Sequence, residues 1–258
     1  MRCQKVAKGV VGSRNYDMYV DDAQLSWLAK DLAAVDKLHL EIKQGELFSL
    51  LGVNGAGKTT TIKILSGLTK PTEGDALVSG YSITKEPELV KRIIGVSPQE
   101  TAVAPNLSVK ENLELICGIH GFSKEKTEVK IRLLAGQFDL DTVLHRKAGK
   151  LSGGWQRRVS IAMALISEPE ILFLDEPTLG LDVIARHDLW ELIRSLKGKI
   201  TIILTTHYME EAAALSDRIG IMKDGRLLAV GMVSELNELA GTDDFETAFV
   251  KIVREGIV

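Results

Sequence analysis

The apolar residues of this chain follow two kinds of pattern. Short continuous apolar runs are typical of strands that are covered on both faces. Runs of this kind occupy residues 45–51, 170–175 and 200–204. Apolar residues at spacings of three and four predict amphipathic helices instead, and these spacings occur at about 60–65, 183–196 and 208–215. A helical pattern follows each buried strand, so the chain is predicted to be an α/β protein with a parallel sheet.

Weaker patterns lie before and after these elements. Strands are predicted at 18–27 and 39–42, where they can form a small antiparallel layer with the strand that ends at Leu51. Residues 1–17 show no pattern and are predicted to be a loose leader. Further short strands are predicted at 76–78, at 93–96 and as a pair across 223–226. The tail from Val233 onward looks helical and amphipathic.

The segment from Ser108 to Lys150 carries no strand signal. Val109, Leu113 and Ile116 recur at helical spacing, and a second set at 129–134 does the same. We therefore expect a helical insert within the α/β chain.

Composition and charge change this picture little, but they exclude several classes of protein. The 258 residues are 45% hydrophobic and 26% charged, with a net charge of −3, which is ordinary for a globular protein. The chain contains no block of Lys and Arg residues of the kind that indicates nucleic-acid binding. Two cysteines, Cys3 and Cys117, make no disulfide framework and fit a reducing cytosol. No apolar run approaches the ~20 residues that span a bilayer, and no signal peptide is visible.

The first candidate site is a glycine-rich turn between the strand ending at Leu51 and the helix after it. Its sequence matches G-x-x-x-x-G-K-[ST], a pattern whose backbone N–H groups surround phosphate at a helix N-terminus. Lys58 is expected to reach the β- and γ-phosphates, and the Thr59 hydroxyl to ligate Mg²⁺. The candidate nucleotide-binding residues here are Gly52, Val53, Asn54, Gly55, Ala56, Gly57, Lys58, Thr59 and Thr60.

The other buried strands end in polar residues as well. Ligands of parallel sheets lie at the carboxyl ends of the strands. Asp175 is therefore placed to hold Mg²⁺, Glu176 to polarise an attacking water, and His207 to lie near the γ-phosphate.

A second glycine-rich turn precedes another predicted helix. Ser152, Gly153 and Gly154 come directly before a long apolar run, which makes a second helix N-terminus suited to an anion. One chain has little use for two separate γ-phosphate sites. We therefore expect this second site to close over a nucleotide held by another copy.

With these motifs in this order, from about Val20 to Gly231, the chain resembles the nucleotide-binding subunits of ATP-binding cassette (ABC) transporters. The matching motifs are the phosphate loop Gly52–Thr59, the Q-loop Gln99, the signature Leu151–Gly154, the strand Ile171–Asp175 with Glu176, the D-loop Asp182 and the switch His207. Two positions depart from the family pattern: Trp155 stands at the fifth signature position, usually glutamine, and Val53 replaces a usual proline.

The resemblance implies a P-loop NTPase fold, with a RecA-like parallel-sheet core, an antiparallel β layer and an inserted α-helical subdomain. It implies an ATPase domain over 18–240, a helical subdomain at about 100–155, and a C-terminal tail at 241–258. Lys58, Glu176 and His207 would be catalytic. Gln99, Ser152–Gly154 and Asp182 would join the phosphate loop in binding ATP, and Thr59, Gln99 and Asp175 would hold Mg²⁺.

Trp27 has two open interpretations, a half-buried strand aromatic or a platform for the adenine ring. The resemblance aligns it with the family's adenine-stacking aromatic only if the following loop is irregular.

The function implied by the resemblance is ATP hydrolysis that powers a transporter, of the drug or polysaccharide exporter type. Its partners would be a polytopic membrane permease and a second copy or homologous cassette, bound head to tail at the cytoplasmic face of the cell membrane. The alternatives are a soluble ABC ATPase of DNA repair or translation, and a regulatory module with an inactive site. The first normally carries a long coiled coil or two cassettes, and the second would lack catalytic residue types that are present here. A G protein is disfavoured because no Asn-Lys-x-Asp motif occurs.

Overall fold

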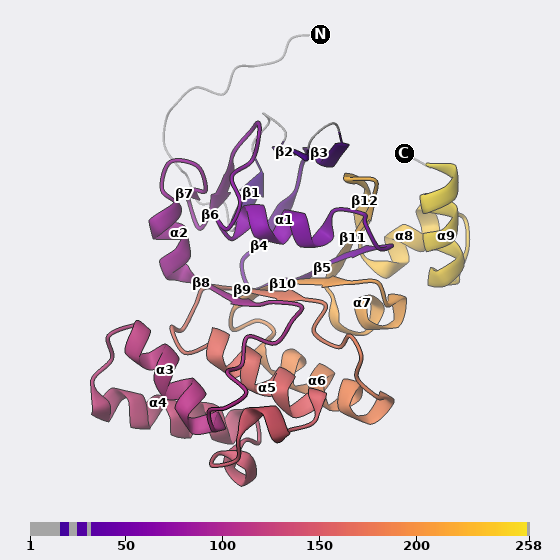
Figure 1. Ribbon diagram of the computed structural model, residues 1–258. Helices are drawn as coiled ribbons and strands as arrows, with labels where there is room; N and C mark the ends of the chain where they lie inside the picture. Colours follow the sequence, from indigo (N-terminus) through magenta and orange to yellow (C-terminus); the bar gives the residue numbers. More distant parts are fainter. Residues whose placement is uncertain (1–15, 21–24, 30–31, 257–258) are drawn as a thin grey trace.

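The computed structural model describes residues 16–20, 25–29 and 32–256. Its centre is a six-stranded sheet with the order β12-β11-β5-β10-β9-β8 (Figure 1). All neighbours are parallel except β11 and β12. The strands are β5 (Leu47–Gly52), β8 (Ile94–Ser97), β9 (Ile171–Asp175), β10 (Thr201–Thr206), β11 (Arg218–Lys223) and β12 (Arg226–Gly231).

The antiparallel part of the fold differs from the prediction in two ways. The strand that leads into the phosphate loop, β5, belongs to the parallel sheet and not to the antiparallel layer. All six of its residues are buried, as a central strand requires. The predicted strand at 18–27 is two strands in different sheets, and the one predicted at 39–42 begins only at Glu41.

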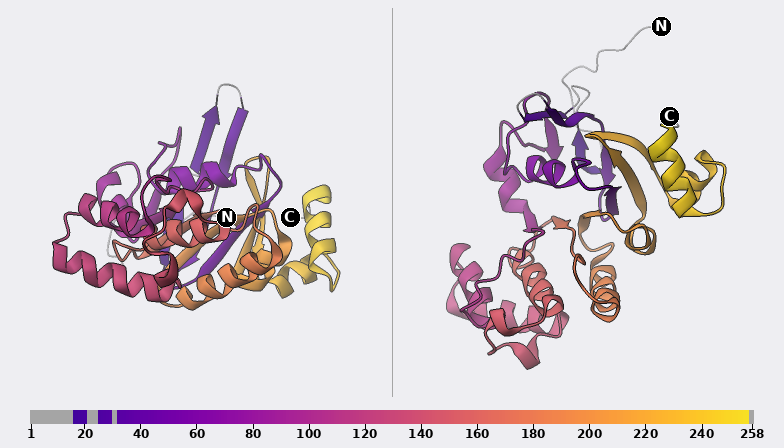
Figure 2. Two further views of the ribbon diagram at one scale, coloured as in Figure 1. Left: turned by 60° about the horizontal axis from the view of Figure 1, so that its bottom comes forward. Right: turned by 45° about the vertical axis from the view of Figure 1, so that its right-hand side comes forward.

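Two smaller sheets take the remaining strands. One has the order β4-β1-β6-β7, and the other pairs β2 with β3, which extend from the body as a two-stranded ribbon (Figure 2). Their strands are β1 (Tyr16–Val20), β2 (Leu25–Ala29), β3 (Leu32–Leu38), β4 (Glu41–Lys43), β6 (Ala76–Val78) and β7 (Tyr81–Ser82). Most of the predicted leader, residues 1–15, lies outside the described residues.

Helices cover both faces of the parallel sheet (Figure 1). Between β8 and β9 the chain is helical, as the missing strand signal predicts. The helices are α1 (Lys58–Leu65), α2 (Pro87–Ile93), α3 (Val109–Ile119), α4 (Lys124–Gln137), α5 (Gly153–Ala164), α6 (Val183–Leu196), α7 (Met209–Leu215), α8 (Val233–Leu239) and α9 (Phe245–Glu255), with two 3₁₀ turns at Asp141–Val143 and Ala148–Lys150.

The sheet separates two apolar cores, which explains the continuous apolar runs. In β9, Leu172 and Leu174 pack with α3 to α6, whereas Ile171 and Phe173 pack with α1 and the antiparallel layer. A third cluster holds α8 and α9 against β11. Because every residue of such a strand faces one core or the other, the sequence shows no alternation.

Candidate functional site

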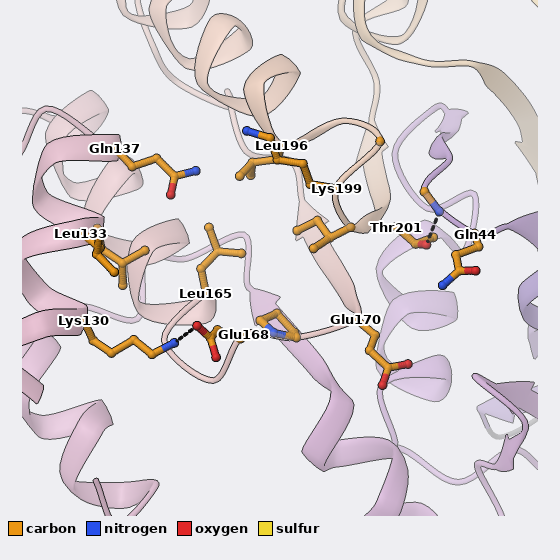
Figure 3. Close-up of a pocket in the computed structure, with 15 residues that line it drawn as sticks. Gln44, Lys130, Leu133, Gln137, Leu165, Glu168, Glu170, Leu196, Lys199 and Thr201 are labelled. Atoms are coloured by element: carbon orange, nitrogen blue, oxygen red, sulfur yellow. Dashed lines mark hydrogen bonds and ion pairs between the residues drawn. The ribbon is translucent and has the colours of Figure 1, made fainter. Parts of the chain in front are cut away.

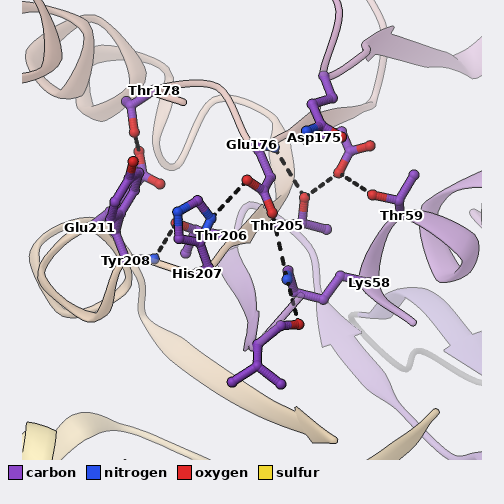
Figure 4. Close-up of polar contacts among 12 residues, drawn as sticks. Lys58, Thr59, Asp175, Glu176, Thr178, Thr205, Thr206, His207, Tyr208 and Glu211 are labelled. Carbon is purple, nitrogen blue, oxygen red and sulfur yellow. Dashed lines mark hydrogen bonds and ion pairs between the residues drawn. The ribbon is translucent and has the colours of Figure 1, made fainter. Parts of the chain in front are cut away.

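The carboxyl ends of β5, β9 and β10 bring the predicted site residues into one layer. In the sheet register, Thr205 pairs with Asp175 on one side and with Leu50 on the other. Gly52 is the last residue of β5, and Glu176 and His207 directly follow β9 and β10. The register therefore brings together three loops that are far apart in the sequence (Figure 4).

The phosphate loop is held in shape by close backbone contacts. Gly57 has φ +98° and is the N-cap of α1, with no side chain capping the helix. A Cβ there would lie 2.3 Å from the Ala34 carbonyl oxygen and 3.3 Å from Gly225 Cα. The Gly225 N–H also donates to the Ala56 carbonyl at 3.1 Å. Only glycine fits position 57, and the first N–H groups of α1 keep no side-chain acceptor.

Lys58 turns its ammonium group back over the loop. Its Nζ donates to the carbonyls of Gly52 at 2.8 Å and Val53 at 3.2 Å, and lies 3.5 Å from Glu176 Oε1. Burial lowers the pKa of Lys58, and the carboxylates of Glu176 and Asp175 oppose that shift. The lysine is thus a buried cation at the point where the helix begins.

Asp175 is bound by two hydroxyl groups. Thr59 Oγ1 donates to its Oδ1 at 3.0 Å, and Thr205 Oγ1 donates to the same oxygen. A hydroxyl from the phosphate loop therefore lies directly against a carboxylate from β9. Sequence reasoning assigned Thr59 and Asp175 to this position but missed Thr205, although it precedes His207 by only two residues.

Glu176 and His207 form a hydrogen-bonded pair, with His207 Nδ1 2.8 Å from Glu176 Oε2. Glu176 has φ +46°, a left-handed conformation that non-glycine residues adopt rarely. Its N–H is 3.1 Å from both the carbonyl and the hydroxyl oxygen of Thr205. Backbone and side chain together hold the carboxylate between Lys58 and His207 (Figure 4).

These groups open into a cavity of about 520 Å³. It is lined by Ala34, Asn54, Gly55, Ala56, Gly57, Lys58, Thr59, Thr60, Gln99, Glu176, Leu179 and His207. Gly52 and Val53 do not line the cavity and contribute carbonyls to Lys58 instead. We call the residues of this cavity together with Asp175 and Thr205 the phosphate-loop group.

A larger cleft of about 600 Å³ lies at the opposite ends of the strands (Figure 3). Gly45, Glu170 and Thr201, which precede or begin β5, β9 and β10, line it, and Lys130 of α4 forms an ion pair with Glu168 there. None of the predicted site residues lies in this cleft. Parallel sheets bind ligands at the carboxyl ends of their strands, so the smaller cavity is the candidate site.

The second predicted helix N-terminus stands apart from the cavity. Ser152, Gly153, Gly154 and Asp182 are absent from its lining. A Cβ on Gly153 would lie 3.4 Å from Leu181, and one on Gly154 would lie 3.1 Å from the Ala185 side chain. The signature turn therefore packs beside the N-terminus of α6, which Asp182 caps by accepting from the Ala185 N–H at 2.9 Å. We call Ser152–Gly154 and Asp182–Ile184 the signature group.

Ser152 leaves its helix uncapped. Its backbone angles, φ −64° and ψ 161°, equal those of Ser123, whose hydroxyl caps α4 by accepting from Lys126 N–H. Ser152 makes no such bond, and Ser152 and Gly153 are exposed. Val183 and Ile184 of the same group are 76% and 75% exposed. The signature group is thus an open surface with both polar and apolar parts.

Arg157 connects the two groups and was missed as a functional residue in the sequence. It is buried in α5, and its guanidinium donates to the carbonyls of Pro98 and Gln99, each at 2.6 Å. Burial lowers its pKa, which nearby Asp175 and Glu211 oppose. Gln99, an exposed residue of the cavity lining, is thereby fixed to the signature helix. In the sequence Arg157 stands between Gln156 and Arg158, before the apolar run begins, so no local signal marks it as the buried member of the three.

Two tryptophans carry the uncertain assignments. Trp27 lies in β2 opposite Val35, but its side chain is outside what the structure describes, so its stacking on adenine stays a prediction. Trp155, at the fifth signature position, packs against the core that α3 to α6 form with the sheet and lies under the Arg158 guanidinium. The following Gln156 donates to the carbonyls of Ala148 and Leu151, which is a structural role.

The fold and this cavity define a P-loop nucleoside triphosphatase of the α/β class. Comparisons with known proteins then give the family. The family model described as ABC transporter matches residues 35–179. The doxorubicin resistance ATP-binding protein DrrA of Mycobacterium tuberculosis is 42% identical over 231 residues, which are 88% of this chain and 70% of that protein. The Nod factor export ATP-binding protein I of Rhizobium etli is 40% identical, over 88% of this chain and 72% of its own.

Solved structures agree with the sequence relatives. The ATP-binding subunit of an ABC transporter matches with a TM-score of 0.80 and 29% identity, covering 91% of this chain and 98% of its own. A dimeric post-hydrolysis state of an ATP-binding cassette, bound to ADP and Pi, matches with a TM-score of 0.74 and 28% identity, covering 83% and 98%.

The chain therefore belongs to the ABC transporter family, as one of its ATP-binding subunits. It is an ATPase whose hydrolysis is coupled to transport, and the predicted fold class is confirmed. Within the described ranges, every helix is too short or too polar to cross a bilayer.

Proposed function

We propose that two copies of this chain, or this chain and a homologous cassette, bind two ATP molecules head to tail and drive an exporter. Each ATP would lie between the phosphate-loop group of one copy and the signature group of the other. The observation that carries this proposal is the separation of the two groups within one chain. One group forms a cavity, and the other offers an uncapped helix N-terminus with exposed apolar residues beside it.

The chemistry of the phosphate-loop group suits transfer of a γ-phosphoryl group to water. Phosphoryl transfer depends mainly on positioning and on stabilising charge. Phosphate oxygens entering the cavity would compete with the Gly52 and Val53 carbonyls for the Lys58 ammonium. Glu176 would orient and polarise the attacking water, and His207, hydrogen-bonded to that carboxylate, would hold it in place.

The residues present fit a magnesium ion at Thr59 and Asp175. A hydroxyl and a carboxylate oxygen 3.0 Å apart are hard ligands of the kind Mg²⁺ prefers. The described residues contain no cluster of three His, Cys, Asp or Glu side chains that could hold a metal alone. The ion would therefore be shared with the phosphates, with Gln99 near it at the cavity edge, and it would neutralise charge on them.

Asn54–Thr60 would bind the phosphates, with Gly52 and Val53 holding Lys58, and Ser152–Gly154 and Asp182 would complete the partner's site. We assign the ATPase domain to 18–240, with the helical subdomain at about 100–155. Residues 241–258 follow that domain, although α9 buries Ala248 and Ile252 in the third core.

The helical subdomain is the proposed contact with a polytopic membrane permease. Its helices expose apolar side chains, which commonly mark interaction surfaces. They are Leu115 (48% exposed), Ile119 (71%), Val129 (53%) and Leu133 (64%). Arg157 fixes the nearby Gln99 loop to α5, so that docking there can influence the cavity. The protein would then sit at the cytoplasmic face of the cell membrane without crossing it.

The direction of transport is proposed from the relatives. Those named for doxorubicin resistance and Nod factor export support an exporter. DNA repair or translation remains the alternative, and no observation on this chain favours it. Membrane fractionation of the source cells, with pull-down of a permease, tests the transporter assignment; ATPase activity stimulated by DNA or ribosomes instead would contradict it.

The Glu176→Gln variant tests the shared site. Loss of a general base lowers turnover by ~10²–10⁴, while Lys58 and the loop still bind ATP. The closed, ATP-bound pair should therefore accumulate as a two-fold symmetric dimer. Light scattering with and without Mg-ATP measures this. A monomeric variant that hydrolyses ATP at the normal rate contradicts both the role of Glu176 and the shared site.

A further inference from the structure

A buried carboxylate lies behind the Glu176–His207 pair, and none of the motifs above includes it. Glu211, in the first turn of α7, is 0% exposed. Its Oε1 accepts a hydrogen bond from Thr178 Oγ1 at 2.8 Å (Figure 4). The same oxygen accepts another from Trp190 Nε1 at 3.1 Å. One oxygen atom therefore joins the loop after β9, the middle of α6 and the start of α7.

Two of those three segments carry or adjoin the proposed reactive groups. Thr178 lies two residues after Glu176, and α7 begins two residues after His207. Trp190 belongs to the helix that Asp182 caps. The separation of the Glu176 loop from the His207 loop determines whether His207 Nδ1 can reach Glu176. Glu211 bonds the first loop to the helix that follows the second.

A capping role does not explain this carboxylate. A glutamate at the third position of a helix usually bonds back to the N-cap backbone and stays at the surface. Glu211 is buried, and its bonds go to other elements. Burial raises its pKa, against hydrogen bonds from hydroxyl and indole groups and the charge of Arg186. Removing this carboxylate alone would leave the Thr178 hydroxyl and the Trp190 indole N–H without their acceptor, so the carboxylate connects two other elements to α7.

The surroundings connect Glu211 to His207 a second time. Among the described residues, Glu211 Oε2 and Arg186 Nε are both buried without a hydrogen-bond partner. The Arg186 guanidinium lies 4.8 Å from the centre of the Tyr208 ring, which packs 4.0 Å from the His207 ring. Arg186 and Tyr208 therefore support the His207 ring by packing, while Glu211 holds the start of α7, which follows His207 in the chain.

We propose that Glu211 is a positioning residue for ATP hydrolysis, whose Oε1 holds the Glu176 loop and the His207 loop at the separation that their hydrogen bond needs. This rests on the roles proposed for Glu176 and His207. Because Trp190 shares the same oxygen, a shift of α6 on closure against a partner copy would reach the Glu176–His207 pair through Glu211.

Paired substitutions of Glu211 test the role of the acceptor oxygen. Glu211→Gln keeps an oxygen for Thr178 and Trp190, and we expect its kcat to stay within about twofold of the wild type, since the reacting groups keep their positions. Glu211→Leu removes the acceptor, and kcat should fall by about tenfold to a hundredfold through misplacement. KM for ATP should stay unchanged in both, because Lys58 and the phosphate loop are untouched. Glu210→Gln, the exposed neighbour, is the matched control and should be without effect.

A second variant keeps the test decisive if Glu211→Leu fails to fold. Thr178→Val removes one donor at nearly constant volume and should lower kcat without changing KM. Combined with Glu211→Leu it should cause no further loss, because both remove the same bond.

Two results would overturn the proposal: wild-type kcat in Glu211→Leu or in Thr178→Val, or equal losses in Glu211→Gln and Glu211→Leu. Either result leaves the proposed function intact, because that function is tested separately by the Glu176→Gln variant.

Discussion

In the phosphate-loop group, Lys58, Asp175, Glu176 and His207 are each bonded to other members of the site, whereas the signature group consists largely of exposed residues. Both groups have a helix N-terminus preceded by glycine or serine. In the first, the helix points into a cavity walled by three strand ends; in the second, it lies open beside Val183 and Ile184. This difference is the one that the proposed shared site requires, with a cavity in one chain and an open helix N-terminus to complete the cavity of another.

The two groups also differ in how tightly their glycines are enclosed. Gly57 has a carbonyl oxygen 2.3 Å from where its Cβ would stand, while Gly153 would meet only the flexible Leu181 side chain, at 3.4 Å. The shape of the phosphate loop is therefore fixed by folding. The signature turn is less enclosed by its own chain, as the proposed contact with a partner copy requires.

The largest effect should come from substitutions that damage one of the two groups in each copy. Lys58→Ala damages the phosphate-loop group, and Ser152→Asp puts a negative charge at the open helix while keeping a good N-cap residue. Each alone should lose about a hundredfold in turnover, as is usual when one charge-stabilising group is lost. Mixed together, they form heterodimers with one intact site, so activity should recover to about a quarter of the wild type at most.

Two controls accompany the mixing experiment. Ser123→Asp, at an exposed N-cap with the same backbone angles, should leave ATPase activity unchanged. The double variant Lys58→Ala/Ser152→Asp mixed with wild type leaves no heterodimer site intact. Activity of the mixed single variants that does not exceed the sum of the two alone would contradict a site shared between copies.

The enclosure of the glycines predicts a difference in stability. Gly57→Ala combines a left-handed φ with a backbone clash and should lower the free energy of unfolding by about 1–3 kcal/mol. Gly153→Ala lies in the first turn of α5 with room for a methyl group, so the change should stay within about 0.5 kcal/mol. Chemical denaturation of both variants measures this. Equal losses would show that the signature turn is as tightly built as the phosphate loop.

The sequence predicts the phosphate-loop group well because each part is local. A glycine motif between a strand and a helix, and carboxylates or a histidine at buried strand ends, need only the rule that parallel strands end together. The sheet assignment of the strand ending at Leu51 was wrong because an apolar run does not name its neighbours in a sheet. Arg157, Glu211 and Thr205 were missed because the bonds that they make, to Gln99, Thr178 and Asp175 respectively, join residues 58, 33 and 30 positions apart.

Arg157 connects the two groups and should have an intermediate effect. Arg157→Met keeps the apolar stem but removes the bonds to Pro98 and Gln99. We expect about a tenfold loss of kcat, since the Gln99 loop would no longer move with α5. Arg158→Met is the control, because this neighbour pairs with Asp139 and Asp188 at the surface. An equal effect of the two variants would mean that Arg157 serves only the packing of α5.

The smallest effect concerns the pH dependence of ATP affinity, which belongs to the phosphate-loop group alone. Burial lowers the pKa of Lys58 below that of an ordinary lysine, and Glu176 opposes the shift. The phosphates of ATP stabilise the charged form of Lys58, so ATP binding raises the pKa of this lysine. The affinity for ATP is therefore greatest below the pKa that Lys58 has in the free protein. It declines above that pKa by up to about tenfold per pH unit.

Two variants sharpen this expectation, because one should shift the decline in ATP affinity to lower pH and the other should abolish it. In Glu176→Gln the opposing carboxylate is gone, so the pKa of Lys58 falls further and the decline should begin at lower pH. In Lys58→Arg the cation stays charged throughout the alkaline range, so the profile should be flat there. Nucleotide titrations across this range, from neutral pH to the ordinary pKa of lysine, measure all three proteins. If ATP affinity declined at the same pH in all three proteins, the decline would belong to another group. Lys58 would then stay charged throughout this range in spite of its burial.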